Sequence, residues 1–423
     1  MSDTASDIST RIRNLAREAR KASIRMAALS SGIKNELLER MASALEQQRT
    51  TLQQQNDLDV RQARANKLAP AMIDRLILTD ERINAMAQGL REVAALPDPV
   101  GEVSSMWRRP SGIQVGRMRI PLGVIGIIFE SRPNVTADAA GLCLKSGNAI
   151  ILRGGSEAIH SNTAIGNILK GELEHMGLPR AALQVVETTD RSAVGTLLEC
   201  EEDIDLIIPR GGEGLIRFVS ETSRIPVIKH YKGVCHTYVD ADADEEMASR
   251  ICINAKTQRP GVCNALETLL IHKDIAETFV PRIATDMRQH GVELRGCSVT
   301  CSLVSGVNPA THEDWDTEYL DLILALKVVD DMDEAIAHIE DHGSLHTEVI
   351  VTDSYAHAQE FTRRVNSSVT MVNASSRFSD GNQFGLGAEI GISTTKLHSF
   401  GPMGLEDLTT RKFIVFGSGQ VRA

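Results

Sequence analysis

Apolar positions recur every three to four residues through residues 6–95, the spacing that places side chains on one face of a helix. One such series is Ile8, Ile12, Leu15 and Ala19. Turn-forming residues interrupt the pattern at Ser30-Ser31-Gly32 and at Leu68-Ala69-Pro70. The pattern therefore predicts a layer of helices at the beginning of the chain.

The period changes in residues 102–119, where apolar and polar residues mix around a central Ser111-Gly112. This pattern is typical of a β-hairpin. A strand edge that is left open can pair with another chain. We therefore predict that residues 101–119, together with a final strand in residues 401–423, form a small oligomerisation element of a homo-oligomer.

Strand-like and helix-like segments alternate after Pro121. The predicted strands of the first block are Gly123–Phe129, Ala149–Leu152, Leu183–Val186, Ile204–Ile208 and Val227–Ile228, with helices between them. A second block has predicted strands at 237–239, 266–271, 292–294, 347–351 and 369–372. This alternation predicts an α/β fold of two doubly wound parallel-sheet domains with a cleft between them. We expect one domain in residues 1–100 and 120–229 and the other in residues 230–400.

Composition narrows the possible functions. The 423 residues carry a net charge of -11 and only 4% aromatic residues, which argues against nucleic-acid binding. We find no apolar run long enough to cross a membrane and no signal peptide. The seven scattered cysteines show no metal-ligand spacing, so we predict no metal site and a reducing, cytoplasmic location.

A cysteine in a Pro-Gly turn is the first candidate for chemistry. Cys263 lies in Gln258-Arg259-Pro260-Gly261-Val262-Cys263-Asn264, between a predicted helix and a predicted strand. A thiol on such a turn can be held rigid and still be reached by a substrate, and its thiolate is a strong nucleophile. The alternative is an ordinary packing cysteine, since cysteine is often buried.

Two turns with arginine and glycine follow strands of the first block. The first is Arg153-Gly154-Gly155-Ser156, and the second is Arg210-Gly211-Gly212 before a helix. The free N–H groups at the beginning of a helix favour a phosphate. Neither turn has the G-x-G-x-x-G spacing, so the pair predicts a phosphate-bearing cofactor without the usual dinucleotide fingerprint.

The order of motifs resembles the aldehyde dehydrogenase superfamily over nearly the whole chain. More narrowly, FESRPNVT, NAKTQRPGVCNALETLL and VNASSRFSDGNQFGLGAEIGIST resemble the gamma-glutamyl phosphate reductase family. The resemblance implies NADPH-dependent reduction of gamma-glutamyl phosphate to glutamate 5-semialdehyde and phosphate, in proline biosynthesis. It also implies NADPH binding by the first domain and catalysis by the second.

The resemblance gives roles to individual residues. Cys263 would be the nucleophile, and the Asn134 amide with the Cys263 N–H would hold the oxyanion; alternatively, Asn134 only caps a helix. Arg153 and Ser156 would favour NADPH over NADH, because a glutamate at the Ser156 position would repel the 2′-phosphate; alternatively, Arg153 is a solvated surface residue. Two glycines would form the pyrophosphate turn, Gly211 and Gly212. Glu318 would bind the nicotinamide ribose.

The substrate end is assigned less directly. Ser375 and Arg377 lie in the part most like the reductases, and Arg377 would pair with the substrate carboxylate or the leaving phosphate; alternatively, their loop only closes a domain interface.

Residues 228–233 contain no carboxylate where hydrolytic relatives carry a water-activating glutamate, so the thioester would wait for hydride. Two other functions stay open: a CoA-acylating aldehyde dehydrogenase, and a non-catalytic scaffold for glutamate 5-kinase, which is also a candidate partner.

Overall fold

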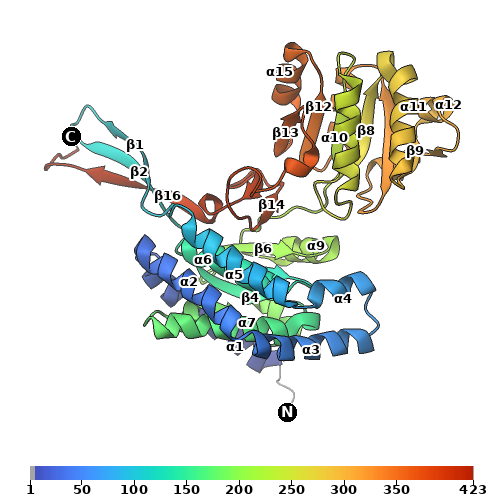
Figure 1. Cartoon of the computed structure of the whole chain (residues 1–423). Helices are drawn as coiled ribbons and strands as arrows, with labels where there is room; N and C mark the ends of the chain where they lie inside the picture. Colours follow the sequence, from blue (N-terminus) through green and yellow to red (C-terminus); the bar gives the residue numbers. More distant parts are fainter. Residues whose placement is uncertain (1–4, 423) are drawn as a thin grey trace. The chain divides into compact units, whose positions relative to one another are not determined.

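The computed structural model describes residues 5–422, which divide into two compact units. Unit 1 holds the chain up to Lys229 together with Leu386–Gly391 and the residues from Met403 onward. Unit 2 holds His230–Gly385 and Ile392–Pro402. Figure 1 colours the chain along its sequence, so that unit 2 includes the yellow and orange elements. No helix within the described range is both long and apolar enough to cross a membrane.

Unit 1 is built around a parallel sheet with the strand order β5-β4-β3-β6. Its strands are β3 (Val124–Phe129), β4 (Ala149–Arg153), β5 (Leu183–Val185) and β6 (Leu206–Arg210). Alternate residues of β3 enter different cores: Ile125 and Ile127 pack into one cluster, and Val124 and Ile128 into another. Both faces of the sheet are therefore covered, as the sequence predicts for a parallel sheet.

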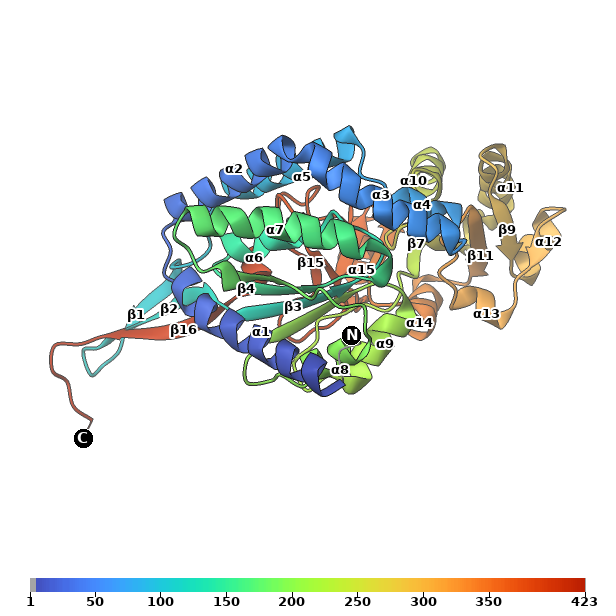
Figure 2. The ribbon, with the colours of Figure 1, turned by 90° about the horizontal axis from the view of Figure 1, so that it is seen from below.

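Helices of unit 1 form two layers around this sheet. They are α1 (Ala5–Met26), α2 (Ser31–Gln47), α3 (Arg49–Ala65), α4 (Pro70–Leu76), α5 (Asp80–Ala95), α6 (Val135–Lys145), α7 (Ile159–His175), α8 (Ser192–Leu198) and α9 (Glu213–Thr222). The core with α2, α5, α6 and α7 lies on one face, and the core with α1 and α8 lies on the other. Figure 2 shows α1 and α7 on opposite sides of the strands. The predicted N-terminal helical layer is confirmed.

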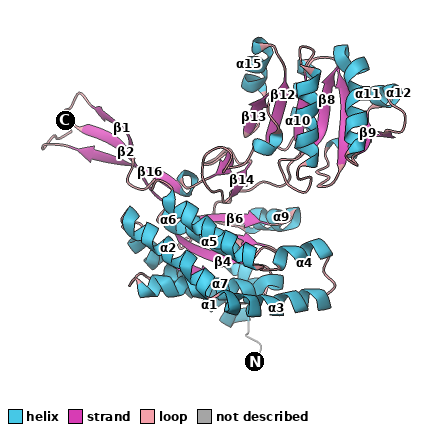
Figure 3. Cartoon of the chain, in the orientation of Figure 1, coloured by secondary structure: helices cyan, strands magenta, loops and turns pink. Residues whose placement is uncertain are grey.

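A small antiparallel sheet extends from unit 1. It has the order β1-β2-β16, with β1 (Val103–Arg108), β2 (Gln114–Pro121) and β16 (Thr409–Phe416). The hairpin turns at Ser111-Gly112, and β16 pairs with β2 from Thr409 opposite Pro121 to Phe416 opposite Gln114. Figure 3 shows these strands in magenta beyond the helices of unit 1. The predicted hairpin and final strand are therefore confirmed as structure, and their role in oligomerisation stays a prediction.

Unit 2 contains a second parallel sheet, with the order β10-β9-β11-β8-β7-β12-β13. Its strands are β7 (Cys235–Val239), β8 (Leu266–His272), β9 (Glu293–Gly296), β10 (Asn308–Pro309), β11 (Ile323–Val329), β12 (Thr347–Val351) and β13 (Val369–Val372). Its helices are α10 (Glu245–Thr257), α11 (Lys273–Gln289), α12 (Ser298–Leu303), α13 (His312–Trp315), α14 (Met332–His342) and α15 (Tyr355–Arg364).

The faces of the second sheet also alternate. Leu269 and Ile271 of β8 pack with α10 and α11, whereas Leu270 packs with α14 and α15. This sheet is therefore doubly wound as well. Two short strands, β14 (Gly391–Ser393) and β15 (Gly401–Met403), pair where the chain passes between the units.

One predicted strand is wrong, and one long strand was not predicted. Val227–Ile228 is not a strand, because only Val227 forms an isolated bridge, to Ile207 of β6. Strand β11, which lies between β9 and β8, was not predicted. Its sequence, Ile-Leu-Ala-Leu-Lys-Val-Val, is a nearly continuous apolar run, and periodicity alone does not separate such a run from a buried helix.

Candidate active site

The turn that carries Cys263 joins α10 to β8, as the sequence predicts. The Cys263 side chain is partly exposed. Gly233 packs against the backbone of Cys263 so closely that any side chain at position 233 would collide with the Cys263 carbonyl group. The turn is therefore fixed from one side by a backbone contact that only glycine permits.

A buried ion pair brackets the same turn. Lys256, near the end of α10, donates from Nζ to Oε2 of Glu267 in β8 at 2.7 Å, and both side chains are inaccessible to solvent. Burial lowers the pKa of Lys256 and raises the pKa of Glu267 to about 7. Removing one partner would leave an uncompensated buried group, so the pair fixes the two ends of the turn together.

A third set of contacts connects the turn to residues 375–379. Ser376 Oγ donates to the Asn264 carbonyl at 2.7 Å, and Asn264 Nδ2 donates to the Ser379 carbonyl at 2.8 Å. The predicted substrate residues Ser375 and Arg377 are therefore adjacent to the Cys263 turn. The Ser375 hydroxyl is buried and accepts the N–H of Arg377 at 3.3 Å. It contributes to the shape of this loop.

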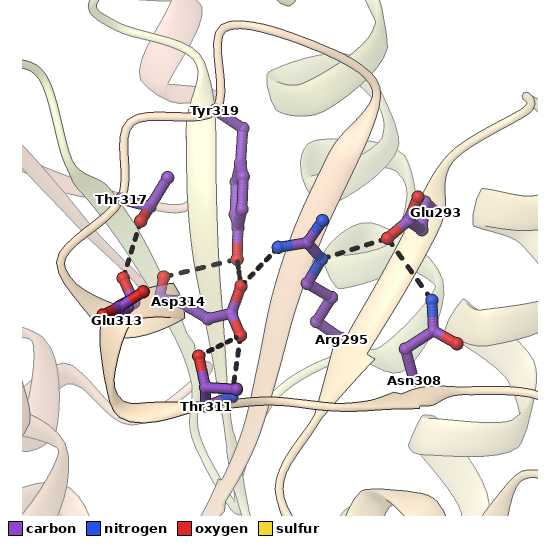
Figure 4. A network of polar contacts seen from close by, with 8 residues as sticks. All are labelled: Glu293, Arg295, Asn308, Thr311, Glu313, Asp314, Thr317 and Tyr319. Carbon is purple, nitrogen blue, oxygen red and sulfur yellow. Dashed lines mark hydrogen bonds and ion pairs between the residues drawn. The ribbon is translucent and has the colours of Figure 1, made fainter.

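Glu318 belongs to a loop that is anchored in unit 2. Asp314 accepts hydrogen bonds from Arg295, Thr311 and Tyr319, as Figure 4 shows. Although burial acts to raise it, these hydrogen bonds lower the pKa of Asp314 to about 2. Leu320 N donates to Glu267, and the charge of Glu318 contributes to raising the pKa of Glu267. The loop with Glu318 therefore lies beside the pair that brackets Cys263.

Other cysteines are poorer candidates for the nucleophile. Cys235 Sγ donates to the Cys263 carbonyl at 3.2 Å, but burial raises the pKa of Cys235 well above its ordinary value. Burial also raises the pKa of Cys252 to about 12 and the pKa of Cys143. A buried thiol that stays protonated is a weak nucleophile. These three cysteines are structural.

Arg153 of unit 1 is half-buried at the end of β4. Its guanidinium donates from Nη1 to the Gly154 carbonyl at 3.0 Å and from Nη2 to the Thr189 carbonyl at 3.4 Å. Its Nε is buried and without a hydrogen-bond partner in residues 5–422. Arg153 is therefore partly buried and is held by two backbone carbonyl groups. Gly155 leads into the exposed Ser156, where a short 3-10 helix begins.

Two glutamates that the sequence analysis did not consider lie at the predicted cofactor turns. Glu157 Oε1 accepts from the Ser131 hydroxyl at 2.9 Å, so its carboxylate is held by Ser131. Glu130 Oε2 accepts the Gly212 N–H at 3.0 Å. The predicted pyrophosphate turn at Gly211 and Gly212 is therefore capped by the carboxylate of Glu130 in this structure.

Asn134 precedes α6 but does not cap it with its side chain. Asn134 Nδ2 instead donates to Asp138 Oδ2 at 2.8 Å, one helical turn later. Burial raises the pKa of Asp138 to about 6, opposed by the Asn134 hydrogen bond and by Arg210. Asn134 therefore occupies the N-cap position of α6 without a side-chain capping bond. Asp138 is a neighbour that the spacing of four residues could have revealed.

Each unit thus gathers part of the predicted site. Unit 2 brings together Cys263, Ser375, Arg377 and Glu318. Unit 1 contains the other predicted site residues: Asn134, Arg153, Gly154, Gly155, Ser156, Gly211 and Gly212. The functional roles of these residues remain predictions.

The sequence profile of the aldehyde dehydrogenase family matches residues 2–295. The gamma-glutamyl phosphate reductase of Geotalea daltonii is 65% identical over 98% of this chain and 99% of its own length. The chain belongs to the aldehyde dehydrogenase family and, within it, to the gamma-glutamyl phosphate reductases.

Other gamma-glutamyl phosphate reductases are also similar to this chain in sequence and in fold. The protein of Desulfatibacillum aliphaticivorans is 57% identical over 97% of this chain and 99% of its own length. The crystal structure of the Thermotoga maritima reductase has a TM-score of 0.96 at 46% identity, covering 97% of this chain and 100% of that one. An acetylating aldehyde dehydrogenase of Geobacillus thermoglucosidasius has a TM-score of 0.69 at 17% identity, with full coverage of both chains, so it shares the fold. The predicted aldehyde dehydrogenase-like fold is confirmed.

Proposed function

We propose that this chain reduces gamma-glutamyl phosphate to glutamate 5-semialdehyde with NADPH, releasing phosphate, as a step of proline biosynthesis. The observation that carries the proposal is the turn around Cys263. It presents a partly exposed cysteine and is fixed by Gly233, by the Lys256–Glu267 pair and by Asn264. A nucleophile held in this way needs little reorganisation when it attacks a substrate.

The proposed reaction proceeds through a thioester on Cys263. The Cys263 thiolate forms a bond to the acyl carbon, and the carbon–oxygen bond to phosphate breaks, so that phosphate leaves with the electron pair. The hydride that reduces the resulting thioester comes from NADPH. The carbon–sulfur bond then breaks, which regenerates the thiolate and releases the aldehyde. Covalent capture thus divides one difficult reduction into two easier steps.

The oxyanion that forms on the acyl oxygen needs neutral donors. We assign this role to the Asn134 amide and the Cys263 N–H. The hydrogen bond from Asn134 to Asp138 supports the assignment, because it uses one amide hydrogen and fixes the direction of the other. The side chain makes no hydrogen bond that caps α6.

We assign NADPH binding to residues 1–100 and 120–229 and catalysis to residues 230–400. Arg153, with its buried Nε without a partner, suits the 2′-phosphate of NADPH. Ser156 adds no negative charge there. Gly154 and Gly155 are assigned to the same cofactor turn, and the amides at Gly211 and Gly212 suit the pyrophosphate. Glu318 is assigned to the nicotinamide ribose.

The segment 228–233 supports reduction over hydrolysis. It contains no carboxylate that could activate water against the thioester. Lys232 in this segment donates from Nζ to the Asp316 carbonyl at 2.5 Å, so it helps to hold the loop that leads to Glu318. A thioester that meets no water-activating carboxylate from this segment would persist until hydride arrives.

The test is an assay in the oxidative direction with purified protein, glutamate 5-semialdehyde, NADP and phosphate. We expect formation of NADPH that requires phosphate, and its loss in Cys263→Ala with retained NADPH binding. Formation of NADPH with CoA and not with phosphate would instead assign a CoA-acylating enzyme. No NADPH formation with either acceptor would favour a scaffold, for which glutamate 5-kinase is the predicted partner.

We also propose that the β1-β2-β16 sheet joins copies of the chain. Strands β1 and β16 form the edges of this sheet, and large apolar side chains along them are exposed: Met106, Trp107, Phe413, Val415 and Phe416. Open edges with apolar side chains favour pairing with another chain. Light scattering on Phe413→Asp, compared with the unmodified protein, should give a smaller particle; an unchanged mass would contradict this role.

A further inference from the structure

Arg259 lies in the turn before Cys263, and nothing above gives it a role. It is four residues before the nucleophile, and its side chain is exposed. Within the described chain, Arg259 makes no hydrogen bond, ion pair or ring contact. An arginine that holds no acidic partner at the edge of an active-site turn is available for an anion.

Arg377 reaches the same turn from residues 375–379. Its Nε donates to Gln258 Oε1 at 2.8 Å, so its guanidinium is tied to the residue next to Arg259. Its Nη1 and Nη2 donate to no residue of the range 5–422. The planar fork of this arginine therefore has its two terminal amino groups open for a ligand.

Arg259 and Arg377 both lie at the turn that begins at Gln258, and within residues 5–422 no carboxylate forms an ion pair with either of them. Burial and the neighbouring Arg259 lower the pKa of Arg377, whereas a Cys263 thiolate and Asp380 act in the opposite direction. Asp380 forms no ion pair with Arg377; its carboxylate accepts the N–H groups of Asn382 and Gln383. Adjacent like charges cost free energy unless an anion joins them, so the arrangement favours an anionic ligand.

We propose that Arg259 and Arg377 together bind the phosphate group of the acyl phosphate substrate beside Cys263. The inference rests on the proposed function. It assigns Arg377 to the phosphate, and it adds Arg259 as its partner. Two guanidinium groups would also stabilise the charge that grows on the phosphate as its bond to the acyl carbon breaks.

The chemistry of the substrate decides between its two anionic ends. The phosphate is bonded to the carbon that the thiolate attacks, so it must lie next to the sulfur. The α-carboxylate lies at the other end of the glutamate chain. Arg259 is in the nucleophile's own turn, and Arg377 is bonded to that turn through Gln258, so both suit the phosphate end.

The test compares Michaelis constants in the oxidative direction for Arg259→Gln, Arg377→Gln and Arg259→Lys. Arg282→Gln is the matched control, since Arg282 is exposed on α11 and has no polar contact within the described residues. We expect each glutamine variant to raise the Michaelis constant for phosphate about tenfold or more, as loss of a charge-assisted hydrogen bond predicts. The Michaelis constant for the semialdehyde should change less than about twofold. In Arg259→Lys, the Michaelis constant for phosphate should lie between those of the unmodified protein and Arg259→Gln.

Two results would overturn the proposal. A raised constant for the semialdehyde with an unchanged constant for phosphate would assign the arginines to the α-carboxylate. Unchanged constants for both would remove them from the substrate site. Circular dichroism and NADP binding establish that each variant is folded.

A second measurement does not depend on turnover. Inorganic phosphate should slow alkylation of Cys263 by iodoacetamide in the unmodified protein and in Arg282→Gln, and less so in Arg259→Gln. If the protein has no semialdehyde activity, the proposed function is wrong. Protection of Cys263 by phosphate then still shows whether Arg259 binds phosphate. Absence of protection in the unmodified protein would overturn the phosphate site.

Discussion

The substitution Asp138→Asn tests whether burial raises the pKa of Asp138, the residue that accepts a hydrogen bond from Asn134. Burial raises the pKa of Asp138 to about 6, from an ordinary value of 3.8. This difference corresponds to about 3 kcal/mol, an upper limit because the side chain is only part-buried and solvent screens its charge. The folded protein therefore holds the proton more tightly than the unfolded chain does.

The difference in pKa between the folded and the unfolded chain determines how the stability changes with pH. A carboxyl group whose pKa is raised by folding stabilises the fold below about pH 4, and this stabilisation is lost as pH rises through about 6. Asparagine keeps an oxygen that can accept from Asn134 and carries no charge. We therefore expect the variant to gain stability relative to the unmodified protein as pH rises, by up to about 3 kcal/mol between about pH 4 and about pH 7.

Hydrogen exchange read by mass spectrometry in peptides from α5 and α6 provides the free energies at each pH. Asp57→Asn removes the same charge from an exposed position on α3 and is the control for loss of charge alone. A stability difference between Asp138→Asn and the unmodified protein that stays constant with pH would refute the reasoning.

Three further substitutions test the proposed site. Ser156→Glu should lower the preference for NADPH over NADH, because a carboxylate would repel the 2′-phosphate; an unchanged ratio of kcat/KM values would remove Ser156 from cofactor selection. Glu130→Gln should strengthen NADPH binding in a titration followed by fluorescence, because the Glu130 carboxylate now accepts the Gly212 N–H and repels the pyrophosphate; weaker binding would contradict this competition. Gly233→Ala should lower kcat by about tenfold or more, because its methyl group would displace the Cys263 carbonyl; activity equal to that of the unmodified protein would show that the turn is less tightly fixed than the contact implies.

Local patterns in the sequence were sufficient for the elements around the nucleophile. The helical period of α10 and the strand-length run of β8 flank the Pro-Gly turn, so their positions follow from the residues themselves. Strand β11 was missed because its apolar run has no clear period. Its place beside β8 depends on pairing between segments far apart in the chain.

Long-range polar contacts limited what could be predicted of the site. Glu130 and Gly212 are 82 residues apart, and no local sequence pattern predicts their hydrogen bond. The Lys256–Glu267 pair also depends on how α10 and β8 meet. The contact between Asn134 and Asp138 is different from these long-range contacts, because a spacing of four residues at the beginning of a helix is a local pattern that predicts contact.

The most direct test of the central claim is the site of covalent attachment during a single turnover. The protein is mixed with gamma-glutamyl phosphate in the absence of NADPH, quenched with acid and digested, and the peptides are weighed by mass spectrometry. The account predicts a glutamyl thioester on the peptide with Cys263, which disappears when NADPH is added before the quench. A glutamyl group on another residue, or turnover by Cys263→Ala, would contradict it.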